Sequence, residues 1–427
     1  MNEAAIWVLT VWLFALALGV PIYLTLALAG AVLAFELNVP ALVVPQRIAM
    51  AANSFPLVAA PFFIFMAGVM NFSGVTTRIF QFAGVLVGWL PGGLAHANIV
   101  ASVIFAGMSG SAVADAGGLG TLEIKAMRDA GYQVPFAAAV TAASSTIGPI
   151  LPPSLPMVIY GVIAETSIGG LFLGAVVPGL LMALALMVRV YLVAEKEQIP
   201  RHPFPGFIEM WRSFKEAFWA LLTPVILLWG ILSGVFTPTE AAVVAAAYAL
   251  VVGGLVYRDF TLEELPRVIT DTVHTTGVVM ALVMTAVLMA WTLSAARVPQ
   301  TIGFYLASLA ESPLTFLLIT NLLLLLVGLF MEAIAAMLIL VPILVPAAMT
   351  VGIDPLQFGV IFVLNLMIGT ITPPVGIVLF VTAKIAEISF EEVAKATLPF
   401  LLPLIIVLLL ITFFPPLTTW LPRLFGL

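Results

Sequence analysis

The chain has 427 residues, of which 63% are hydrophobic and only 8% are charged, and its formal net charge is −6. Soluble domains carry about 25% charged residues, so this composition excludes a soluble globular protein and predicts one that lies in the lipid bilayer. The absence of cysteine excludes disulfides and CxxC metal sites, the three histidines are scattered, and no basic block indicates nucleic acid.

Long apolar stretches predict an all-α polytopic membrane protein. The first, Ile6 to Phe35, reads as one retained span and not as a signal peptide, because it lacks a basic n-region and a small-residue cleavage site. The first half continues with Phe55–Phe72, Ile79–Leu90, Ala95–Ala106, Ala112–Met127, Phe136–Ile163 and Leu171–Val193. After a polar segment, the second half has Leu221–Leu232, Ala241–Tyr257, Thr272–Leu293, Ile302–Leu309, Thr315–Leu329, Ala333–Val351, Phe358–Ile385 and Leu398–Phe414.

Two of these stretches are interrupted in the same way, by a Gly followed by a Pro-Pro pair. Ile147 to Met157 reads IGPILPPSLPM, and Ile368 to Val378, which starts 221 positions later, reads IGTITPPVGIV. Proline removes a backbone donor and blocks the carbonyl four residues back, so both helices must break and leave carbonyls unpaired. Matched breaks in two halves are typical of a secondary transporter's binding site, where bare carbonyl oxygens suit sodium. The alternative is a kink that serves packing alone.

The 221-residue shift predicts an internal repeat. It aligns residues 106–153 with 327–374 without a gap, although a chance alignment of two apolar segments is the alternative. The identical pairs that carry the repeat are Gly107/Gly328, Gly131/Gly352, Gly148/Gly369, Pro152/Pro373 and Pro153/Pro374, and Pro178/Pro399 extends it.

The basic residues predict that the two repeats are inverted. We assume that the pairs ending at Met127 and Val351 re-enter without crossing, and that Ile79–Leu90 and Ile302–Leu309 lie flat. Nine crossings then remain, and only Arg47, Arg297 and Arg423 of the 15 basic residues lie outside. This positive-inside bias places the N-terminus in the cytoplasm and the C-terminus outside.

The predicted organisation has five parts. Residues 1–50 form an N-terminal scaffold helix and connection. Residues 51–194 form the first repeat, with a re-entrant hairpin at about 95–128 and a broken helix at about 135–164. Residues 195–270 hold an amphipathic cytoplasmic segment and scaffold helices. Residues 271–415 form the second repeat, with a hairpin at about 313–351 and a broken helix at about 355–386, and residues 416–427 form a tail.

The predicted hairpin tips carry polar groups in an apolar context. The first tip has Ser109, Ser111 and Asp115, whose alternative roles are close helix packing and, for Asp115, a helix cap. Glu332 aligns with Ser111 in the second repeat. A carboxylate there costs about 2.5–3.5 kcal/mol on insertion scales, so it should face a polar cavity, where it binds substrate or a cation, carries a proton, or serves structure alone.

Three further residues each have two possible roles. The hydroxyl of Thr372, in the second break, can join a cation shell or bond back to its own helix. Arg47 and Arg297 are candidate partners for an anion, but interfacial anchoring is the simpler reading.

Four motifs resemble the large membrane subunit of TRAP transporters, the tripartite ATP-independent periplasmic carriers. They are FAGMSGSAVAD, ASSTIGPILPPSLPMVIYG, FTPTEAAVVAAAYA and IGTITPPVGIVLF. The resemblance covers essentially the whole chain. It implies sodium-driven uptake of an organic acid through the bacterial inner membrane, an elevator fold, a small partner membrane subunit and a periplasmic substrate-binding protein.

The resemblance also implies particular site residues. The first sodium site would use Ser109, Ser111, Gly148, Leu151 and Pro153, and the second would use Gly328, Gly369, Thr372 and Val375. Ser111 and Glu332 would face substrate. Glu332 stands where the family usually has Asp, and Pro156 stands where some relatives have a hydroxyl, so the substrate contacts differ here.

The same residues leave other functions open. A stand-alone sodium- or proton-coupled carboxylate carrier of related hairpin architecture is the nearest alternative. A channel or an intramembrane enzyme belongs to another class, but the sequence offers no histidine, aspartate-pair or metal cluster at depth for an enzyme. We therefore predict a transporter without a cofactor other than coupling sodium ions.

Overall fold

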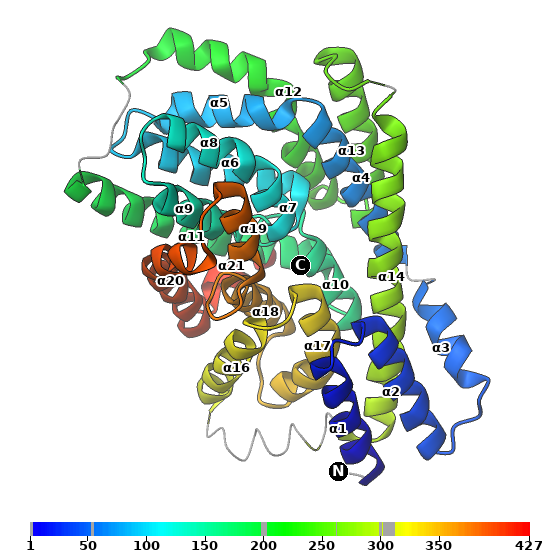
Figure 1. Ribbon diagram of the computed structural model, residues 1–427. Coiled ribbons are helices and arrows are strands. Elements are labelled where there is room, and N and C mark those ends of the chain that lie inside the picture. The colour runs from blue at the N-terminus through cyan, green and yellow to red at the C-terminus, as the bar shows by residue number, and fades with distance from the viewer. Residues whose placement is uncertain (1–2, 53–54, 198–202, 262, 299–300, 302–311) are drawn as a thin grey trace.

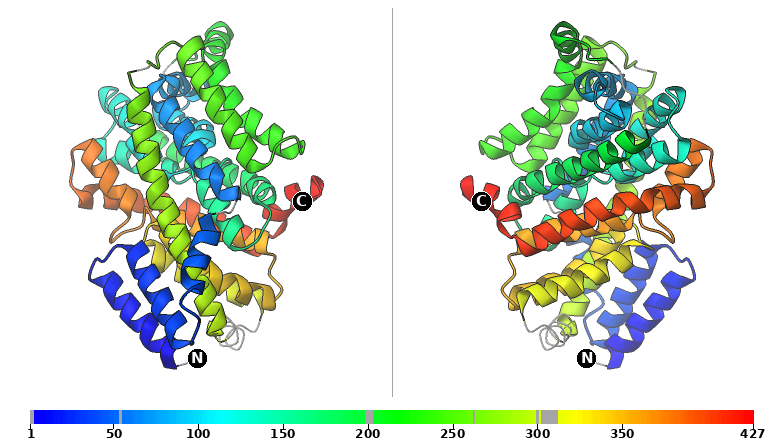
Figure 2. Two further views of the ribbon diagram at one scale, coloured as in Figure 1. Left: turned by 90° about the vertical axis from the view of Figure 1, so that its right-hand side faces the viewer. Right: turned by 90° about the vertical axis from the view of Figure 1, so that its left-hand side faces the viewer.

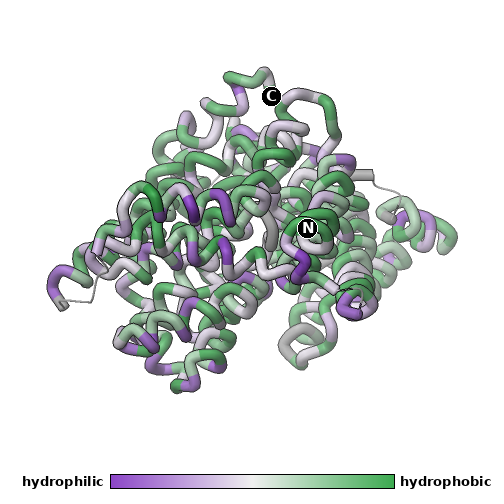
Figure 3. Tube along the Cα trace, turned by 90° about the horizontal axis from the view of Figure 1, so that it is seen from above, coloured by the Kyte–Doolittle hydropathy of each residue, from purple (hydrophilic) through white to green (hydrophobic). Residues whose placement is uncertain are grey.

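The computed structural model describes residues 3–52, 55–197, 203–261, 263–298, 301 and 312–427, without the side chains of 3–5, 16–17, 52, 55–56, 107–109 and 197. This part of the chain contains helices and no strand, and hydrophobic residues dominate the trace (Figure 3). Six of its helices are long and apolar enough to cross a membrane, or seven if a bent pair counts as one span. The predicted all-α membrane class is therefore confirmed.

The N-terminal apolar stretch forms two helices, α1 (Glu3–Ala17) and α2 (Ile22–Glu36), so the prediction of a single span is wrong. Gly19 adopts a left-handed φ of 80° and Pro21 precedes α2, which ends one helix and starts the next. The helices pack against each other, and α2 lies along the C-terminal half of α14 (Figure 1). Crossing counts that treat this stretch as one span do not hold.

A frame of long helices surrounds one side of the molecule (Figures 1 and 2). The frame, called the scaffold below, comprises α2, α3 (Val43–Ala52), η1 (Phe55–Val58), α4 (Ala59–Phe72), α5 (Val75–Val87), α12 (Phe207–Leu232), α13 (Pro238–Val251), η2 (Val252–Val256) and α14 (Leu265–Ala295). α5 contains much of the first segment predicted to lie flat and is bent by 71° from α4. The other such segment, Ile302–Leu309, lies outside the described residues.

Specific contacts fix the scaffold at its turns. α13 begins with a capping box in which the Thr237 hydroxyl accepts from the Glu240 backbone N–H and the Glu240 carboxylate accepts from that of Thr237. Arg78 of α5 forms an ion pair of 2.6 Å with Asp259 and lies 4.1 Å from the ring centre of Tyr257. These contacts join the bend between α4 and α5 to the connection between η2 and α14.

The remaining described helices, except α1, which packs against α2, form a second body, called the core body, beside the scaffold. In the first half it contains α6 (Gly93–Ser109), α7 (Ala112–Gly117), α8 (Leu119–Asp129), α9 (Val134–Ser145), α10 (Leu155–Ile163) and α11 (Ile168–Glu197). In the second half it contains α16 (Pro313–Gly328), α17 (Ala333–Thr350), α18 (Pro355–Gly369), α19 (Ile377–Ala386), α20 (Phe390–Phe413) and α21 (Pro416–Leu424).

The two halves of the core body share one interior. Tyr160 of α10 is fully buried, its hydroxyl donates to the Pro355 carbonyl at 2.8 Å, and its ring lies 6.1 Å from that of Phe362. The absence of a side chain at Gly359 makes this contact possible, because a Cβ there would lie 2.4 Å from the Tyr160 ring. The two halves therefore pack as one unit.

Candidate functional site

Both interrupted helices stop before their Pro-Pro pairs and restart after them. α9 ends at Ser145 and α10 begins at Leu155, while α18 ends at Gly369 and α19 begins at Ile377. Both Pro-Pro peptide bonds are cis. Across the first gap, the Ser154 hydroxyl donates to the Pro149 carbonyl and accepts from the Met157 N–H. The gaps are thus defined turns that place backbone oxygens between two helix ends.

The two hairpin tips use equivalent residues as helix caps. The Ala114 N–H donates to the Ser111 hydroxyl at the start of α7 (3.4 Å), and the Ala335 N–H donates to a Glu332 carboxylate oxygen at the start of α17 (3.1 Å). The two capping residues are 221 positions apart and so are the two donor residues, which is the same shift as between the Pro-Pro pairs. Ser111, and not Asp115, is therefore the cap of α7. Asp115 is buried, and its carboxylate has no hydrogen-bond partner within the described part of the chain.

Each tip touches its break through glycine. Gly110 has a left-handed φ of 58°, and a Cβ there would lie 3.2 Å from the Leu155 nitrogen. In the second half a Cβ on Gly369 would lie 2.6 Å from the Gly328 Cα. The Gly376 N–H also donates to the Leu329 carbonyl at 3.4 Å. Close backbone contact therefore joins tip and break in both halves.

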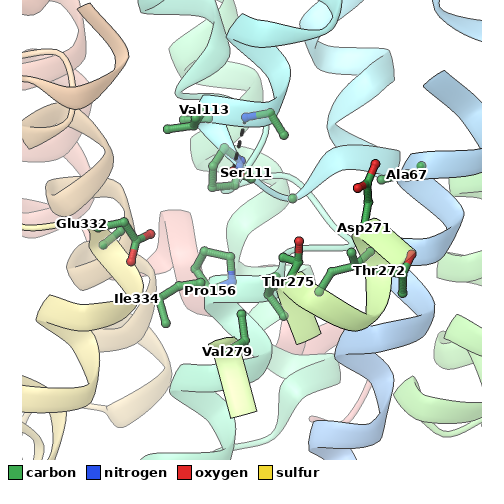
Figure 4. A pocket seen from close by; sticks show the side chains of 18 of the residues that line it. Ala67, Ser111, Val113, Pro156, Asp271, Thr272, Thr275, Val279, Glu332 and Ile334 are labelled. Carbon is green, nitrogen blue, oxygen red and sulfur yellow. Dashed lines mark hydrogen bonds between the residues drawn. The ribbon is translucent and has the colours of Figure 1, made fainter. Parts of the chain in front are cut away.

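A cavity of about 410 Å³ lies where the tips, the breaks and the scaffold meet (Figure 4). α10, α17 and the tip before α7 form one wall, and α4 and α14 form the other. The core body contributes Gly110, Ser111, Ala112, Val113, Ala114, Pro149, Leu155, Pro156, Glu332, Ala333, Ile334, Met367, Thr370 and Ile377. The scaffold contributes Ile64, Ala67, Gly68, Asn71, Phe72, Val268, Asp271, Thr272, Thr275 and Val279.

The cavity brings together the three residues expected to face substrate, namely Ser111, Pro156 and Glu332. Most of the residues expected to bind sodium lie at the tips and breaks and do not line the cavity: Gly148, Leu151, Pro153, Gly328, Gly369, Thr372 and Val375. The side chain of Ser109 is outside the described part. Ser111, which is expected at both kinds of site, lines the cavity, so the candidate substrate and ion positions are adjacent and share this residue.

Two of the residues assigned to sodium have side chains with other contacts. Leu151 packs on α11, since a Cβ on Gly179 would lie 2.5 Å from a Leu151 methyl carbon. The Thr372 hydroxyl donates to the Ile368 carbonyl at 2.7 Å, as one alternative reading predicted, and keeps its lone pairs free for a cation. Leu151 can therefore offer only its carbonyl oxygen.

The donor set at both breaks fits a hard monovalent cation. Apart from the carboxylates of Asp115 and Glu332, the oxygens that the described tips and breaks offer are backbone carbonyls and hydroxyls, and such ligands suit cations of the alkali and alkaline-earth type. Among the described residues, no group of three His, Cys, Asp or Glu side chains can hold a transition metal. Oxygen donors of this kind suit a hard cation and do not by themselves identify the ion.

The polar scaffold wall was not identified from sequence. Asp271, Thr272 and Thr275 of α14 and Asn71 of α4 line the cavity. A signal existed, because the run from Asp271 to Thr276 is polar at the start of an otherwise apolar span. This run lies outside the aligned repeat, so it has no equivalent in the first half of the chain.

The two arginines considered as anion partners do not line the cavity. Arg47 lies over the Trp291 ring at 4.7 Å, and Arg297 follows the C-terminal end of α14 with a positive φ of 58°. The anchoring interpretation therefore fits Arg47 best.

Comparisons with known proteins agree on one family. Residues 9–417 match the family described as tripartite ATP-independent periplasmic transporter, DctM component. The chain is 48% identical over 417 residues to the sialic acid TRAP transporter large permease protein SiaM of Vibrio cholerae, with 97% of both chains covered. It is 42% identical to the C4-dicarboxylate TRAP transporter large permease protein DctM of Pseudomonas aeruginosa, with 88% of both covered.

Two further likenesses concern chain length and fold. The sialic acid TRAP transporter permease protein SiaT of Haemophilus influenzae is 45% identical over 97% of this chain, which spans 68% of SiaT. The crystal structure of the Alcanivorax borkumensis YdaH transporter has a TM-score of 0.65 at 17% identity, covering 87% of this chain and 88% of that one. The second likeness supports the fold alone.

Proposed function

Because the chain belongs to the DctM component family of tripartite ATP-independent periplasmic transporters, and so is a transporter subunit and not an enzyme, we propose that it imports an organic acid across the bacterial inner membrane. The cavity bounded by both hairpin tips and both broken helices carries this proposal. Among the described residues, Ser111, Glu332 and the polar face of α14 converge there. A carboxylate substrate would accept hydrogen bonds there from hydroxyls and backbone N–H groups.

Sodium is the proposed coupling ion. The first ion would bind between the first tip and break, with oxygens of Ser109, Ser111, Gly148, Leu151 and Pro153. The second would bind with oxygens of Gly328, Gly369, Thr372 and Val375. The support is the tight backbone contact of tip and break in each half and an oxygen-only donor set. A bound cation also offsets the charge of Glu332 and of the substrate.

The transport motion that we propose is an elevator, in which the core body moves along the scaffold. The substrate cavity lies between these two bodies, so relative movement can open it to either side. The shared interior around Tyr160 supports movement of the core body as one unit. Scaffold residues on the cavity wall would then touch substrate in only part of the cycle.

A small membrane subunit and a periplasmic substrate-binding protein are the proposed partners. The family description names a tripartite system. This chain spans 68% of SiaT, so SiaT carries a further segment that could correspond to a small subunit. The printed names of relatives include sialic acid and C4-dicarboxylate, so similarity leaves the choice of acid open.

The membrane orientation that we propose places Arg258 and Arg267 in the cytoplasm, following the positive-inside rule. The N-terminus lies at the opposite end of the molecule (Figure 1), so it would face the periplasm, which replaces the placement expected from a single first span. Leu427 lies near Gly169, which also lies near Ile231 at the end of α12 away from Arg212. The C-terminus would then face the periplasm, as expected from the charge count.

Uptake by proteoliposomes containing this chain and its small subunit tests the proposal. N-acetylneuraminate and succinate uptake would be measured with and without a sodium gradient and the cognate binding protein. We expect uptake only when both are present. Uptake that persists without the binding protein would point to the stand-alone carrier, and a steady conductance in planar bilayers would point to a channel.

A further inference from the structure

Two acidic side chains line the cavity from opposite walls. Asp271 comes from α14 on the scaffold, and Glu332 comes from the start of α17 on the core body (Figure 4). Within the described part of the chain, the lining contains no Lys, Arg or His. A site for an organic anion is therefore built with two negative charges and no positive side chain.

The two carboxylates differ in how they are held. Glu332 accepts a hydrogen bond from the Ala335 N–H at 3.1 Å, so one of its oxygens belongs to the helix cap. Asp271 is exposed, and among the described residues it forms neither an ion pair nor a hydrogen bond. Both carboxylate oxygens of Asp271 can therefore accept hydrogen bonds from a ligand that enters the cavity on the scaffold side.

In the described ranges, no basic side chain forms an ion pair with Asp271. Arg267 stands one helical turn earlier, at a spacing that permits an ion pair. Its guanidinium instead lies over the Phe72 ring, 5.5 Å from the ring centre, and it is not part of the cavity lining. On α14 the cavity face follows the spacing 268, 271, 272, 275 and 279, which leaves Arg267 off that face.

We propose that Asp271 is a specificity-determining residue that rejects a second carboxylate, so that the site takes acids with one carboxylate and a neutral, hydroxylated remainder. This inference rests on the proposed function. The substrate carboxylate would lie at the hairpin tips, near the proposed ions. Hydroxyl groups on the rest of the substrate would donate to Asp271, and neighbouring substrate hydroxyls would form hydrogen bonds with Thr272 and Thr275.

Charge supplies the physical reason for this selection. Two like charges about 4 Å apart repel by about 1 kcal/mol in bulk water, and by more where the cavity walls and a bound substrate exclude water from Asp271. A hydroxyl group in the same place gains a charge-assisted hydrogen bond instead. Relatives named for sialic acid and for C4-dicarboxylate are both similar to this chain, so similarity does not select between a monocarboxylate and a dicarboxylate. The charge of the cavity makes that selection in this inference.

Ligand binding to the purified complex of this chain with its small subunit tests the inference without the selectivity of a binding protein. The affinities of N-acetylneuraminate, gluconate, succinate and malate would be measured in sodium by thermal-shift titration. We expect the wild type to bind the better of the two monocarboxylates at least about tenfold more tightly than either dicarboxylate. Asp271→Asn should tighten dicarboxylate binding by about tenfold and reduce that ratio accordingly.

Two variants separate charge in the cavity from charge elsewhere. Asp271→Glu should keep the discrimination, and Glu263→Gln, which removes a charge just before α14 and outside the cavity, should leave all four affinities unchanged. A wild type that prefers dicarboxylates, or an Asp271→Asn variant with an unaltered ratio, would overturn the inference while sodium-dependent binding leaves the proposed function intact. If none of the four acids binds in sodium, both the inference and the proposed function would be overturned.

Discussion

The two tip-and-break units share a backbone plan and differ in charge. Ser111 and Glu332 are equivalent residues, each capping the helix that follows its tip through equivalent N–H donors. One offers a neutral hydroxyl and the other a carboxylate to the same cavity. The difference teaches that the repeat preserves the geometry of the turn and leaves the chemistry of each half free to change.

The polar contacts behind the tips show the same relationship. Ser144 donates to Asn98 in the first half (2.5 Å), and Asn365 donates to Asn321 in the second (3.0 Å), with Ser144 and Asn365 again 221 positions apart. The bond between hairpin arm and broken helix is therefore retained although its residues changed. The donor position on the broken helix is thus kept at the 221-residue shift, whereas the acceptor asparagines, Asn98 and Asn321, are 223 positions apart.

The largest effect should come from filling the backbone contact of the second half. Gly369→Ala places a Cβ 2.6 Å from the Gly328 Cα, where only main-chain movement can relieve the clash. We expect loss of uptake and a destabilisation of about 2 kcal/mol or more, measured by thermal unfolding. Gly277→Ala on α14, which meets nothing within 4 Å, is the control and should behave as wild type. An active Gly369→Ala transporter would show that the two units tolerate different geometries.

Sodium dependence should separate the two proposed ion sites. Replacing Ser109 and Ser111 together by Ala removes two hydroxyl oxygens from the first unit. We expect the sodium concentration for half-maximal uptake to rise by about a hundredfold, since each oxygen ligand contributes about as much as a charged hydrogen bond, about 1.5 kcal/mol or about tenfold. Thr372→Ala tests the second unit in the same way. If the sodium dependence of uptake is unchanged in both variants, the assignment of sodium to these two positions is wrong.

The charge of Glu332 can be separated from its role as a cap. Glu332→Gln keeps an oxygen that can accept from the Ala335 N–H, so stability should stay near wild type while substrate affinity changes by several fold. Glu332→Ala loses both and should cost about 1 kcal/mol of stability in addition. Wild-type affinity in Glu332→Gln would return this residue to a purely structural role.

The smallest effect should come from the polar contacts behind the tips. Asn98→Ala removes the side-chain bonds to Thr141 and Ser144, and Asn321→Ala removes those to Thr412 and Asn365. Ser144, Thr412 and Asn365 each keep a bond to a backbone carbonyl. We therefore expect each variant to lower stability by only about 0.5–1 kcal/mol, with sodium affinity unchanged. Clearly different losses from the two variants would mean that the halves are not equally dependent on this contact.

The sequence predicted the centre of the site because its signals there are local. A Pro-Pro pair after a Gly breaks a helix whatever surrounds it, and the constant shift of 221 residues identified Glu332 as the counterpart of Ser111 before any coordinates. Ser111, Pro156 and Glu332 do meet in one cavity. Their assignment to substrate, and that of the tip and break oxygens to sodium, remain predictions.

Tertiary contacts decided what the sequence did not predict. Ile6 to Phe35 has the length of one span, and only its packing on α14 and the turn at Gly19 to Pro21 makes it two helices. Asp271 reaches the cavity because α14 crosses the core body, and that crossing leaves no periodic or repeated signal. The scaffold residues that line the cavity are thus harder to predict from sequence than the residues of a turn, since they depend on how the scaffold packs against the core body.

The most direct test of the central claim uses the absence of native cysteine in this chain. Thr275→Cys places a thiol in the cavity wall, and Thr261→Cys places one in the exposed connection before α14 as a control. The labelling rate with a charged thiol reagent would be measured with N-acetylneuraminate or succinate, with and without sodium. We predict that one of these acids slows labelling at position 275 only when sodium is present and leaves position 261 unaffected. Labelling at position 275 that no acid changes would contradict the assignment of this cavity as the transport site.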